Sequence, residues 1–493
     1  MILKGKRSSF TILEIIIAIG LFAITVGGIA GLIAQTFSLN RLGEEESYGN
    51  FLAIEGLEAT RAIARRDYFN LVNGTYGLDA TPTSWEFSGN SQNFGKFTRQ
   101  IVVSNVFRDT GGNVVADPTD GTLDLFTKRV EALVTWNFAP GRNNEVSLKT
   151  YFTFWNESIC EWQDTVALNK VGELNLPGNL DATDIEVEED VGYVTQGSSN
   201  RGEFYVLDLS NPVSPQIAGS LTPALSERIN AVSVVGSYAY LATARPAQEL
   251  LVVNVSNPAS PSLVGSNGVP AAVALDVAAT EDFAYLGITS NSGPEFYIYN
   301  ITNPASPAVL GTFEVGKDVS AVSVIGNRAY LAVTITGAGQ PNLLILDISN
   351  PSSPNQVGSY ADPLAPSGAK GEAVFYAGGI AHLVISGSAS DPLYYLLDVS
   401  NPASINRIGY LPAQGAMQGI NDVEAGSGFA LLATNKADSA ILIVDIRNPA
   451  QPKTKFPVPL GPGVNGLGAE INGCNAYVAS SDPNEEIKVL APQ

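Results

Sequence analysis

The chain contains few of the residues from which catalytic sites are most often built. Its 493 residues include one histidine, His382, and two cysteines. A single histidine with no second histidine or free thiol beside it is poor material for a metal site or a catalytic triad. His382 also fills a position at which other copies of an internal repeat have tyrosine, so we expect it to be a packing residue. No catalytic or metal site is predicted, and we expect the protein not to be an enzyme.

Positive charge is also scarce. The chain has 27 Lys and Arg against 48 Asp and Glu, a net charge of -21. Up to residue 160 there are 14 basic and 16 acidic residues, and beyond it 13 basic and 32 acidic. The acidity therefore belongs to the C-terminal part. Nucleic acid is not expected as a partner of that part, because phosphate binding needs clustered Lys and Arg. Solubility outside the cell is the favoured interpretation.

One long apolar run stands near the N-terminus. It extends from Phe10 to Leu39, contains the single charge Glu14 and follows the basic leader MILKGKRSS. It exceeds the roughly 20 residues that cross a bilayer, and the basic leader would stay cytoplasmic. A secretory signal peptide is disfavoured because its apolar region spans only about 7 to 15 residues. An ordinary anchor is disfavoured because an unpaired carboxylate inside a spanning helix is costly.

The same stretch resembles the type IV prepilin signal, which has a basic leader, a small residue and Phe-Thr-x-x-Glu opening a long apolar helix. The resemblance implies that a prepilin peptidase cuts between Ser9 and Phe10 and methylates the new amino group of Phe10. It also implies that Glu14 pairs with a neighbouring pilin subunit during filament assembly. Ser9 departs from the family, which usually has glycine there, and this bears on the efficiency of processing. The expected location is the cytoplasmic membrane, N-terminus inside, and then an extracellular pilus.

The residues after the apolar run predict that the helix continues. Phe51, Ile54, Leu57 and Ile63 recur at helical spacing between charged residues, and Asn73-Gly74 is a stop signal. We expect one helix from residue 10 to about 69, nearly 90 Å long at about 1.5 Å per residue, with a break near Gly43.

Period-two alternation of β-branched and aromatic residues predicts strands over 96–107, 129–138 and 145–155. A long helix followed by a small antiparallel sheet is the layout of a pilin head, and the helix sequence resembles minor pilins. The loop between the first two strands contains Asp117, Asp120 and Asp124, whose oxygens suit Ca²⁺. Their spacing matches no calcium-loop motif, so a solvated turn is favoured and no cofactor is predicted.

An internal repeat organises the rest of the chain. Strings such as LVVNVSNPASP place an Asn-Pro step at intervals of 46 to 51 residues, at Asn211, Asn257, Asn303, Asn350, Asn401 and Asn448. A hairpin signature precedes each, and a seventh hairpin precedes IKVLAPQ at the C-terminus. Four short strands per period of this length predict a propeller blade. Residues 169–178 match the fourth strand of a blade but lack a preceding Asn-Pro turn, so we expect them to complete the last blade and close a seven-bladed ring.

These strings resemble the LVIVD repeat of bacterial and archaeal surface proteins, over about residues 168–493. The Asp or Asn three residues before each Asn-Pro step could suggest a ring of ion ligands, but Asx side chains that organise turns are the favoured interpretation. Cys160 and Cys474 should approach the same blade, and a disulfide is favoured over free thiols in an oxidising compartment.

The sequence thus predicts a multidomain, mainly β protein. We expect a leader at 1–9, a membrane and filament helix at 10–70, a pilin-like α+β head at 71–158, a linker at 159–167 and a seven-bladed propeller at 168–493. The favoured function is a minor pilin, located at the filament tip, whose propeller binds a glycan or protein on a surface. Two alternatives remain open: a pseudopilin-like subunit of a secretion or DNA-uptake machine that engages cargo, and an extracellular propeller enzyme acting on surface polysaccharide.

Overall fold

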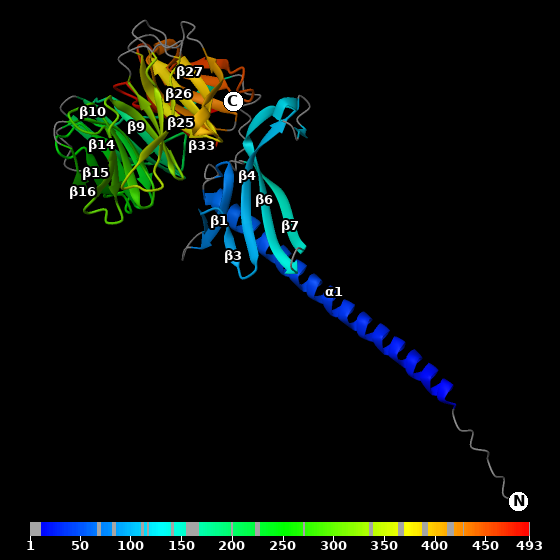
Figure 1. The fold of residues 1–493 in the computed structure, drawn as a ribbon. Helices are drawn as coiled ribbons and strands as arrows, with labels where there is room; N and C mark the ends of the chain where they lie inside the picture. Colours follow the sequence, from blue (N-terminus) through cyan, green and yellow to red (C-terminus); the bar gives the residue numbers. More distant parts are fainter. Residues whose placement is uncertain are drawn as a thin grey trace, which may run out of the picture. The chain divides into compact units, whose positions relative to one another are not determined.

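The chain forms two compact units, which are described separately below (Figure 1). The first lies within Met1–Arg66, Gly74–Val103 and Arg129–Tyr151, and the second within Asp67–Asn73, Ser104–Lys128 and Phe152–Gln493. The computed structural model describes residues 11–66, 71–80, 85–109, 113–115, 118–139, 142–153, 167–198, 201–221, 227–269, 272–334, 339–362, 369–386, 393–411, 419–426 and 428–492.

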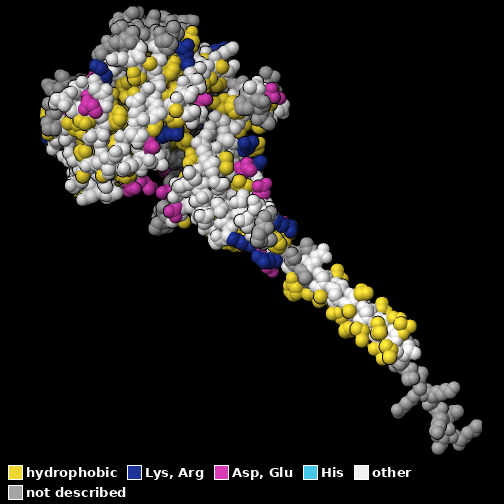
Figure 2. All heavy atoms as spheres, in the orientation of Figure 1, with side chains coloured by type: hydrophobic (Ala, Val, Ile, Leu, Met, Phe, Trp, Pro, Cys, Tyr) yellow, Lys and Arg dark blue, Asp and Glu magenta, His cyan; other side chains and the backbone are white. Residues whose placement is uncertain are grey.

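Helix α1 runs without interruption over the 55 residues Ile12–Arg66. The expected break near Gly43 is absent, because the helical hydrogen-bond pattern continues through this glycine and the segment contains no proline. The described large apolar side chains from Ile12 to Phe37 are 47 to 78 % exposed. They cover the projecting part of the helix (Figure 2). By length and composition, this is a helix that could span a membrane.

The C-terminal half of α1 buries only part of the predicted apolar pattern. Leu52 and Ile63 are buried, whereas Phe51 is 58 % and Ile54 54 % exposed. The reason is close packing against the sheet by small residues. A Cβ atom at Gly56 would lie 3.0 Å from side-chain atoms of both Arg99 and Ile101, so glycine sets the distance of approach. The large apolar side chains of Phe51 and Ile54 lie beside this contact and therefore remain exposed.

An antiparallel sheet follows the helix. Its order is β2-β1-β4-β6-β7, with β3 and β5 pairing with β4. The strands are β1 (Gly74–Ala80), β2 (Trp85–Ser88), β3 (Gln92–Phe94), β4 (Phe97–Arg108), β5 (Val114–Val115), β6 (Thr122–Ala139) and β7 (Arg142–Thr153). β4, β6 and β7 are the three strands expected from the alternation, although β6 is longer. β4 and β6 contribute residues to both compact units.

The second unit contains a seven-bladed β-propeller, as the repeat predicts. Each blade is a four-stranded antiparallel sheet. The first three blades consist of β9 (Ala182–Glu188), β10 (Val191–Ser198), β11 (Arg201–Asp208) and β12 (Gln216–Ser220); β13 (Ile229–Val235), β14 (Tyr238–Thr243), β15 (Leu250–Asn254) and β16 (Ser262–Asn267); and β17 (Ala274–Ala279), β18 (Phe283–Ile288), β19 (Phe296–Asn300) and β20 (Ala308–Phe313).

Blades four to six follow the same plan. They consist of β21 (Val319–Ile325), β22 (Arg328–Val333), β23 (Leu343–Asp347) and β24 (Asn355–Tyr360); β25 (Lys370–Ala377), β26 (Ile380–Ser386), β27 (Leu393–Asp398) and β28 (Asn406–Leu411); and β29 (Ile420–Gly426), β30 (Phe429–Thr434), β31 (Ile441–Asp445) and β32 (Lys453–Val458). The second and third strands are buried on both faces between neighbouring blades, which explains their continuous apolar sequences.

Blade 7 is assembled from both ends of the repeat region, as the sequence predicts. Its strands are β33 (Gly466–Asn472), β34 (Asn475–Ser480), β35 (Ile487–Pro492) and β8 (Leu168–Leu174). We call β8 the clasp strand. It pairs antiparallel with β35, with Leu168 opposite Pro492 and Leu174 opposite Ile487. The innermost strands of successive blades are neighbours around the whole ring, including β33 and β9.

Neighbouring blades also interlock at the Asn-Pro turns. In six blades the outer strand carries a glycine at which a Cβ atom would lie 2.0 to 2.4 Å from the carbonyl oxygen of the next blade's turn proline; the glycines are Gly172, Gly219, Gly265, Gly311, Gly358 and Gly409. Blade 6 has Phe456 at this position. The exception has a simple cause, because blade 7, its neighbour, is the one blade without an Asn-Pro turn.

This interlock predicts the effect of an added methyl group. Gly265→Ala should lower the free energy of unfolding by about 1 to 3 kcal/mol, because its Cβ would overlap the carbonyl oxygen of Pro304. Gly426→Ala is the control: nothing lies within 4 Å of its Cβ, and we expect a change of about 0.5 kcal/mol or less. Urea unfolding measures both. Equal effects would contradict the interlock.

Candidate functional site

The two faces of the propeller differ in how regular their connections are. Because strands alternate in direction, the Asn-Pro turns between third and fourth strands lie on the same face as the first hairpin turns, here called the turn face. All six Asn-Pro connections are seven residues long: 209–215, 255–261, 301–307, 348–354, 399–405 and 446–452. On the opposite face, here called the loop face, connections range from two residues (199–200) to nine (334–342 and 361–369). The repeats therefore diverge on the loop face.

The Asn-Pro turns form through local hydrogen bonds. The backbone oxygen of each turn asparagine accepts the N–H of the residue three positions later at 2.9 to 3.0 Å, in Asn211, Asn257, Asn303, Asn350, Asn401 and Asn448. The Asx side chain three residues upstream accepts an N–H two positions on at 2.8 to 3.0 Å, in Asp208, Asn254, Asn300, Asp347, Asp398 and Asp445. These oxygens organise the turns.

Acidic side chains line the innermost strands around the propeller axis. Asp184, Asp276 and Asp422 each accept one N–H from their own strand. Each also accepts an N–H from the innermost strand of the next blade at 2.7 to 3.0 Å; the donors are Val232, Val322 and Ala469. Each aspartate thus bridges two blades. Sequence reasoning missed this role, because it depends on the strand register at a β-bulge.

Burial raises the pKa of these groups. Loss of solvation raises the pKa of Asp184 to about 7, and the charge of Asp422 adds to the effect. Burial likewise raises the pKa of Asp276 to about 7. Three glutamates on innermost strands, Glu186 on β9, Glu424 on β29 and Glu470 on β33, have pKa values well above the ordinary range, first because of burial and then because of neighbouring carboxylates. The environment of the axis therefore favours the protonated form of these carboxyl groups.

A second acidic position was also missed. Glu249, Glu295 and Glu486 precede the third strand of their blades and are fully buried. Each carboxylate accepts backbone N–H groups of the loop that leaves the fourth strand, at Val269, at Val315 and Gly316, and at Leu176. The signal was present in the sequence as a glutamate before an apolar run, in QELLVVN, PEFYIYN and EEIKVL. These glutamates hold the base of the loop face.

The remaining candidate residues are scattered. His382 is fully buried, its Nδ1 lies 2.6 Å from the Tyr394 hydroxyl, and burial lowers its pKa to about 3. Asp124 pairs with Arg108 at 2.6 Å, and Asp120 ends a short 3₁₀ helix. Among the described residues, no group of His, Cys, Asp or Glu is placed to hold a metal ion.

Several predicted residues lie outside the described part of the chain. Ser9, Phe10, Asp117 and Cys160 fall there, and for Glu14 only the helical backbone is described. Cys474 lies in the turn between β33 and β34. The Cys160–Cys474 disulfide therefore stays a prediction.

The LVIVD repeat model matches five stretches of this chain: 180–222, 229–267, 272–315, 316–362 and 422–458. These are blades 1 to 4 and blade 6, so the protein contains LVIVD repeats. No curated protein matches the chain.

The solved structures similar to this chain are remote. They include a Lactobacillus plantarum protein (10 % identity, 73 % of this chain and 96 % of that one, TM-score 0.47). A computationally designed protein, Ika8, is 10 % identical over 65 % of this chain and 99 % of its own, with a TM-score of 0.44. A chain of the Mitotic Checkpoint Complex is 12 % identical over 67 % and 94 %, with a TM-score of 0.45. At this level the likenesses carry no argument about function.

The axial carboxylates predict how stability depends on pH. A folded-state pKa above the ordinary value means that the folded protein binds the proton more tightly than the unfolded chain, so stability falls as pH rises toward that pKa. With Asp184 and Asp276 near 7, the melting temperature should fall from about pH 5 to about pH 8. Hydrogen bonds from Lys170 and Lys488 lower the pKa of Glu485 to about 2. The contribution of ionised Glu485 to stability is therefore lost only in stronger acid. Calorimetry across this range tests the sign, and a rising melting temperature would contradict it.

Proposed function

We propose that this chain is a minor type IV pilin that presents its propeller as an extracellular binding module. The observation that carries the proposal is the exposed apolar first half of α1, from Ile12 to Phe37. A surface of this extent needs a lipid or protein environment, and a membrane followed by a filament core provides both in turn. The processing site at Ser9 and Phe10 and the assembly residue Glu14 enter through the resemblance to prepilins.

The second half of α1 supports assembly with other subunits. Phe51 and Ile54 are 58 and 54 % exposed, and Tyr48 is 44 % exposed although the edge of its ring packs on Phe97 of β4. Their exposure follows from the glycine-mediated contact that buries the opposite side. They form an apolar surface that neighbouring pilin helices would cover. A propeller of this size cannot be carried by every subunit of a closely packed filament, which favours low stoichiometry or a tip position.

The propeller is proposed to bind rather than to catalyse. The aspartates at its axis are engaged by backbone N–H groups from two strands each, which makes them structural. The loop face, where connection lengths vary from blade to blade, is the proposed binding face. The partner would be a glycan or a protein on another surface. A pseudopilin-like subunit of a secretion or uptake machine is the second candidate, since such a subunit would assemble through the same N-terminal helix.

A pair of isosteric variants tests the assembly role. Glu14→Gln should abolish recovery of the protein with sheared surface filaments while leaving it in the membrane fraction, because the neutral side chain cannot pair with a neighbouring N-terminus. Glu44→Gln, on the same helix beyond the apolar run, is the control and should assemble normally. Immunoblotting of both fractions provides the measurement. Normal recovery of the Glu14 variant would refute the assembly role.

Binding is tested separately from assembly. Cells carrying the Glu14→Gln variant should lose attachment to a surface that cells with the unaltered protein bind, as should cells in which residues 168–493 are deleted. Retention of adhesion by the second strain, with normal filaments, would remove the binding role from the propeller.

A further inference from the structure

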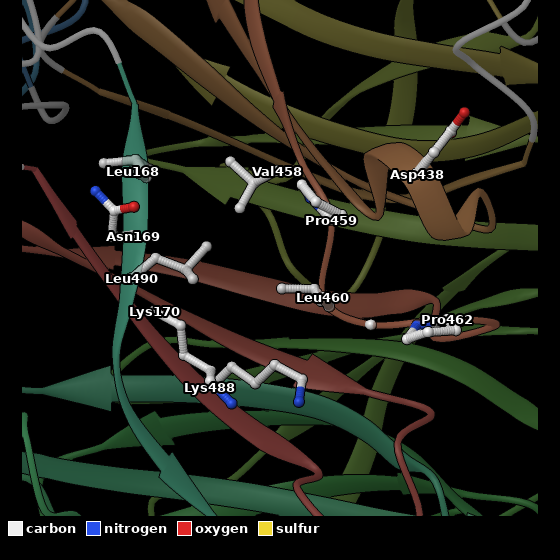
Figure 3. Close-up of a pocket in the computed structure, with 11 residues that line it drawn as sticks. Leu168, Asn169, Lys170, Asp438, Val458, Pro459, Leu460, Pro462, Lys488 and Leu490 are labelled. Atoms are coloured by element: carbon white, nitrogen blue, oxygen red, sulfur yellow. The ribbon is translucent and has the colours of Figure 1, made fainter.

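Two lysines of the second compact unit, Lys128 and Lys488, are almost completely buried. A buried ammonium group needs partners, because its charge has lost the solvation of water. Lys488 has carboxylate partners: its Nζ lies 2.9 Å from Asp482 and 2.8 Å from Glu485. It lines a groove of about 650 Å³ beside the clasp strand (Figure 3). The charge of this lysine is therefore compensated in the way that is usual for a buried lysine.

Lys128, on β6, has neutral partners instead. Its Nζ donates hydrogen bonds to Oδ1 of Asn105 on β4 at 2.7 Å, to Oδ1 of Asn73 at 3.2 Å and to the backbone oxygen of Gly378 at 3.2 Å. Within the described part of the chain, no carboxylate is paired with this amino group. All four residues belong to the second compact unit. The amino group of Lys128 thus faces two carboxamides.

The site around the amino group is closed by the propeller. The turn Gly378–Gly379 joins β25 to β26 in blade 5, and both glycines have positive φ. A Cβ atom at Gly379 would lie 3.7 Å from Nζ of Lys128 and 3.9 Å from Oδ1 of Asn105, so this turn covers both groups. Val72 packs against the core that blades 4 and 5 share. Lys128 is 1 % exposed, and water hardly reaches it.

Burial also changes the chemistry of the amino group. Loss of solvation lowers the pKa of Lys128 to about 8, and the charge of Asp398 opposes this change only in part. A desolvated lysine is a nucleophile, because more of it is uncharged near neutral pH. The contact with Oδ1 holds Nζ next to Cγ of Asn105, the carbon bonded to that oxygen. Groups held together in this way react much faster than groups that must first meet.

We propose that Lys128 and Asn105 form an intramolecular isopeptide bond, which is a covalent cross-link between β6 and β4. Lys128 first releases one proton to solvent. Its Nζ then attacks Cγ of Asn105, so that the Nζ–Cγ bond forms and the Cγ–Nδ2 bond breaks. One of the two remaining Nζ protons passes to Nδ2, which leaves as ammonia. The last proton stays on the new amide and is still donated to the backbone oxygen of Gly378.

The cross-link would strengthen a pair of strands that both compact units share. β4 and β6 are neighbours in the sheet, and each contributes residues to both units. A bond between Asn105 and Lys128 prevents these strands from separating at the end that belongs to the second unit. The proposal goes beyond the function proposed above and does not depend on it, because it concerns a reaction within one chain.

Mass spectrometry of the full-length protein, denatured and digested with trypsin, tests the cross-link. Trypsin cuts after Arg99, Arg108 and Arg129 but not after a lysine whose Nζ is acylated. We expect peptides 100–108 and 109–129 to be recovered mainly as one joined species, lighter than their sum by one ammonia. Fragmentation should place the link at Asn105 and Lys128. Recovery of peptide 100–108 mainly in its free and unmodified form would overturn the proposal.

Three variants identify the reacting groups. Lys128→Arg keeps the positive charge but removes the nucleophile, because a guanidinium is not deprotonated. Asn105→Ala removes the carbonyl carbon that is attacked. Both variants should give only unjoined peptides. Asn73→Ala is the matched control, since Asn73 contacts the same Nζ, and it should keep the cross-link. Loss of ammonia that persists in Lys128→Arg would show a cyclised asparagine instead and would contradict the assignment, as would loss of the link in Asn73→Ala alone.

Discussion

Pairing of the clasp strand with β35 is the interaction on which the propeller depends. Every other blade is a continuous run of four strands, but blade 7 exists only when Leu168–Leu174 meets Ile487–Pro492. Without this pairing, β35 would be a free edge and blade 7 would have three strands. Contacts between residues so distant in the chain are costly to form early in folding. We therefore expect the ring to close late, after the other blades have formed.

The repeated turns join neighbouring blades, whereas the variable loops differ from blade to blade. On the turn face, six connections of equal length pack their proline carbonyls on the glycine of the preceding blade. On the loop face, buried glutamates such as Glu249 and Glu295 hold the loop bases by accepting backbone N–H groups. Loop length can then vary without disturbing the blades. This arrangement supplies a rigid frame with one adaptable surface, which is what a binding module needs.

The features that recur in the sequence led to the most accurate predictions. Six Asn-Pro turns, seven hairpins and one unmatched outer strand were enough to infer the blade number and the closure. Phe456 would also have been informative, since it replaces the packing glycine only where the next turn is missing. The apolar helix was equally predictable, because an apolar run of this length exceeds what a signal peptide contains and is long enough to span a membrane.

Features that depend on packing distance or register were not predictable. The buried face of α1 is set by Gly49 and Gly56, which a search for large apolar residues overlooks. The bridging role of Asp184 depends on a β-bulge that brings its carboxylate to the next blade. The first strands of the small sheet were missed because residues 74–94 show little alternation. Each of these features is defined by a neighbour that is distant in sequence.

The central claim is that α1 begins as a processed filament helix and that the propeller is carried outside the cell. Mass spectrometry of the N-terminal peptide, from protein recovered with sheared surface filaments, tests it most directly. The account predicts a peptide that begins at Phe10 with a methylated amino group. An intact leader beginning at Met1, found in the membrane fraction and absent from filaments, would contradict the claim and leave an anchored surface propeller.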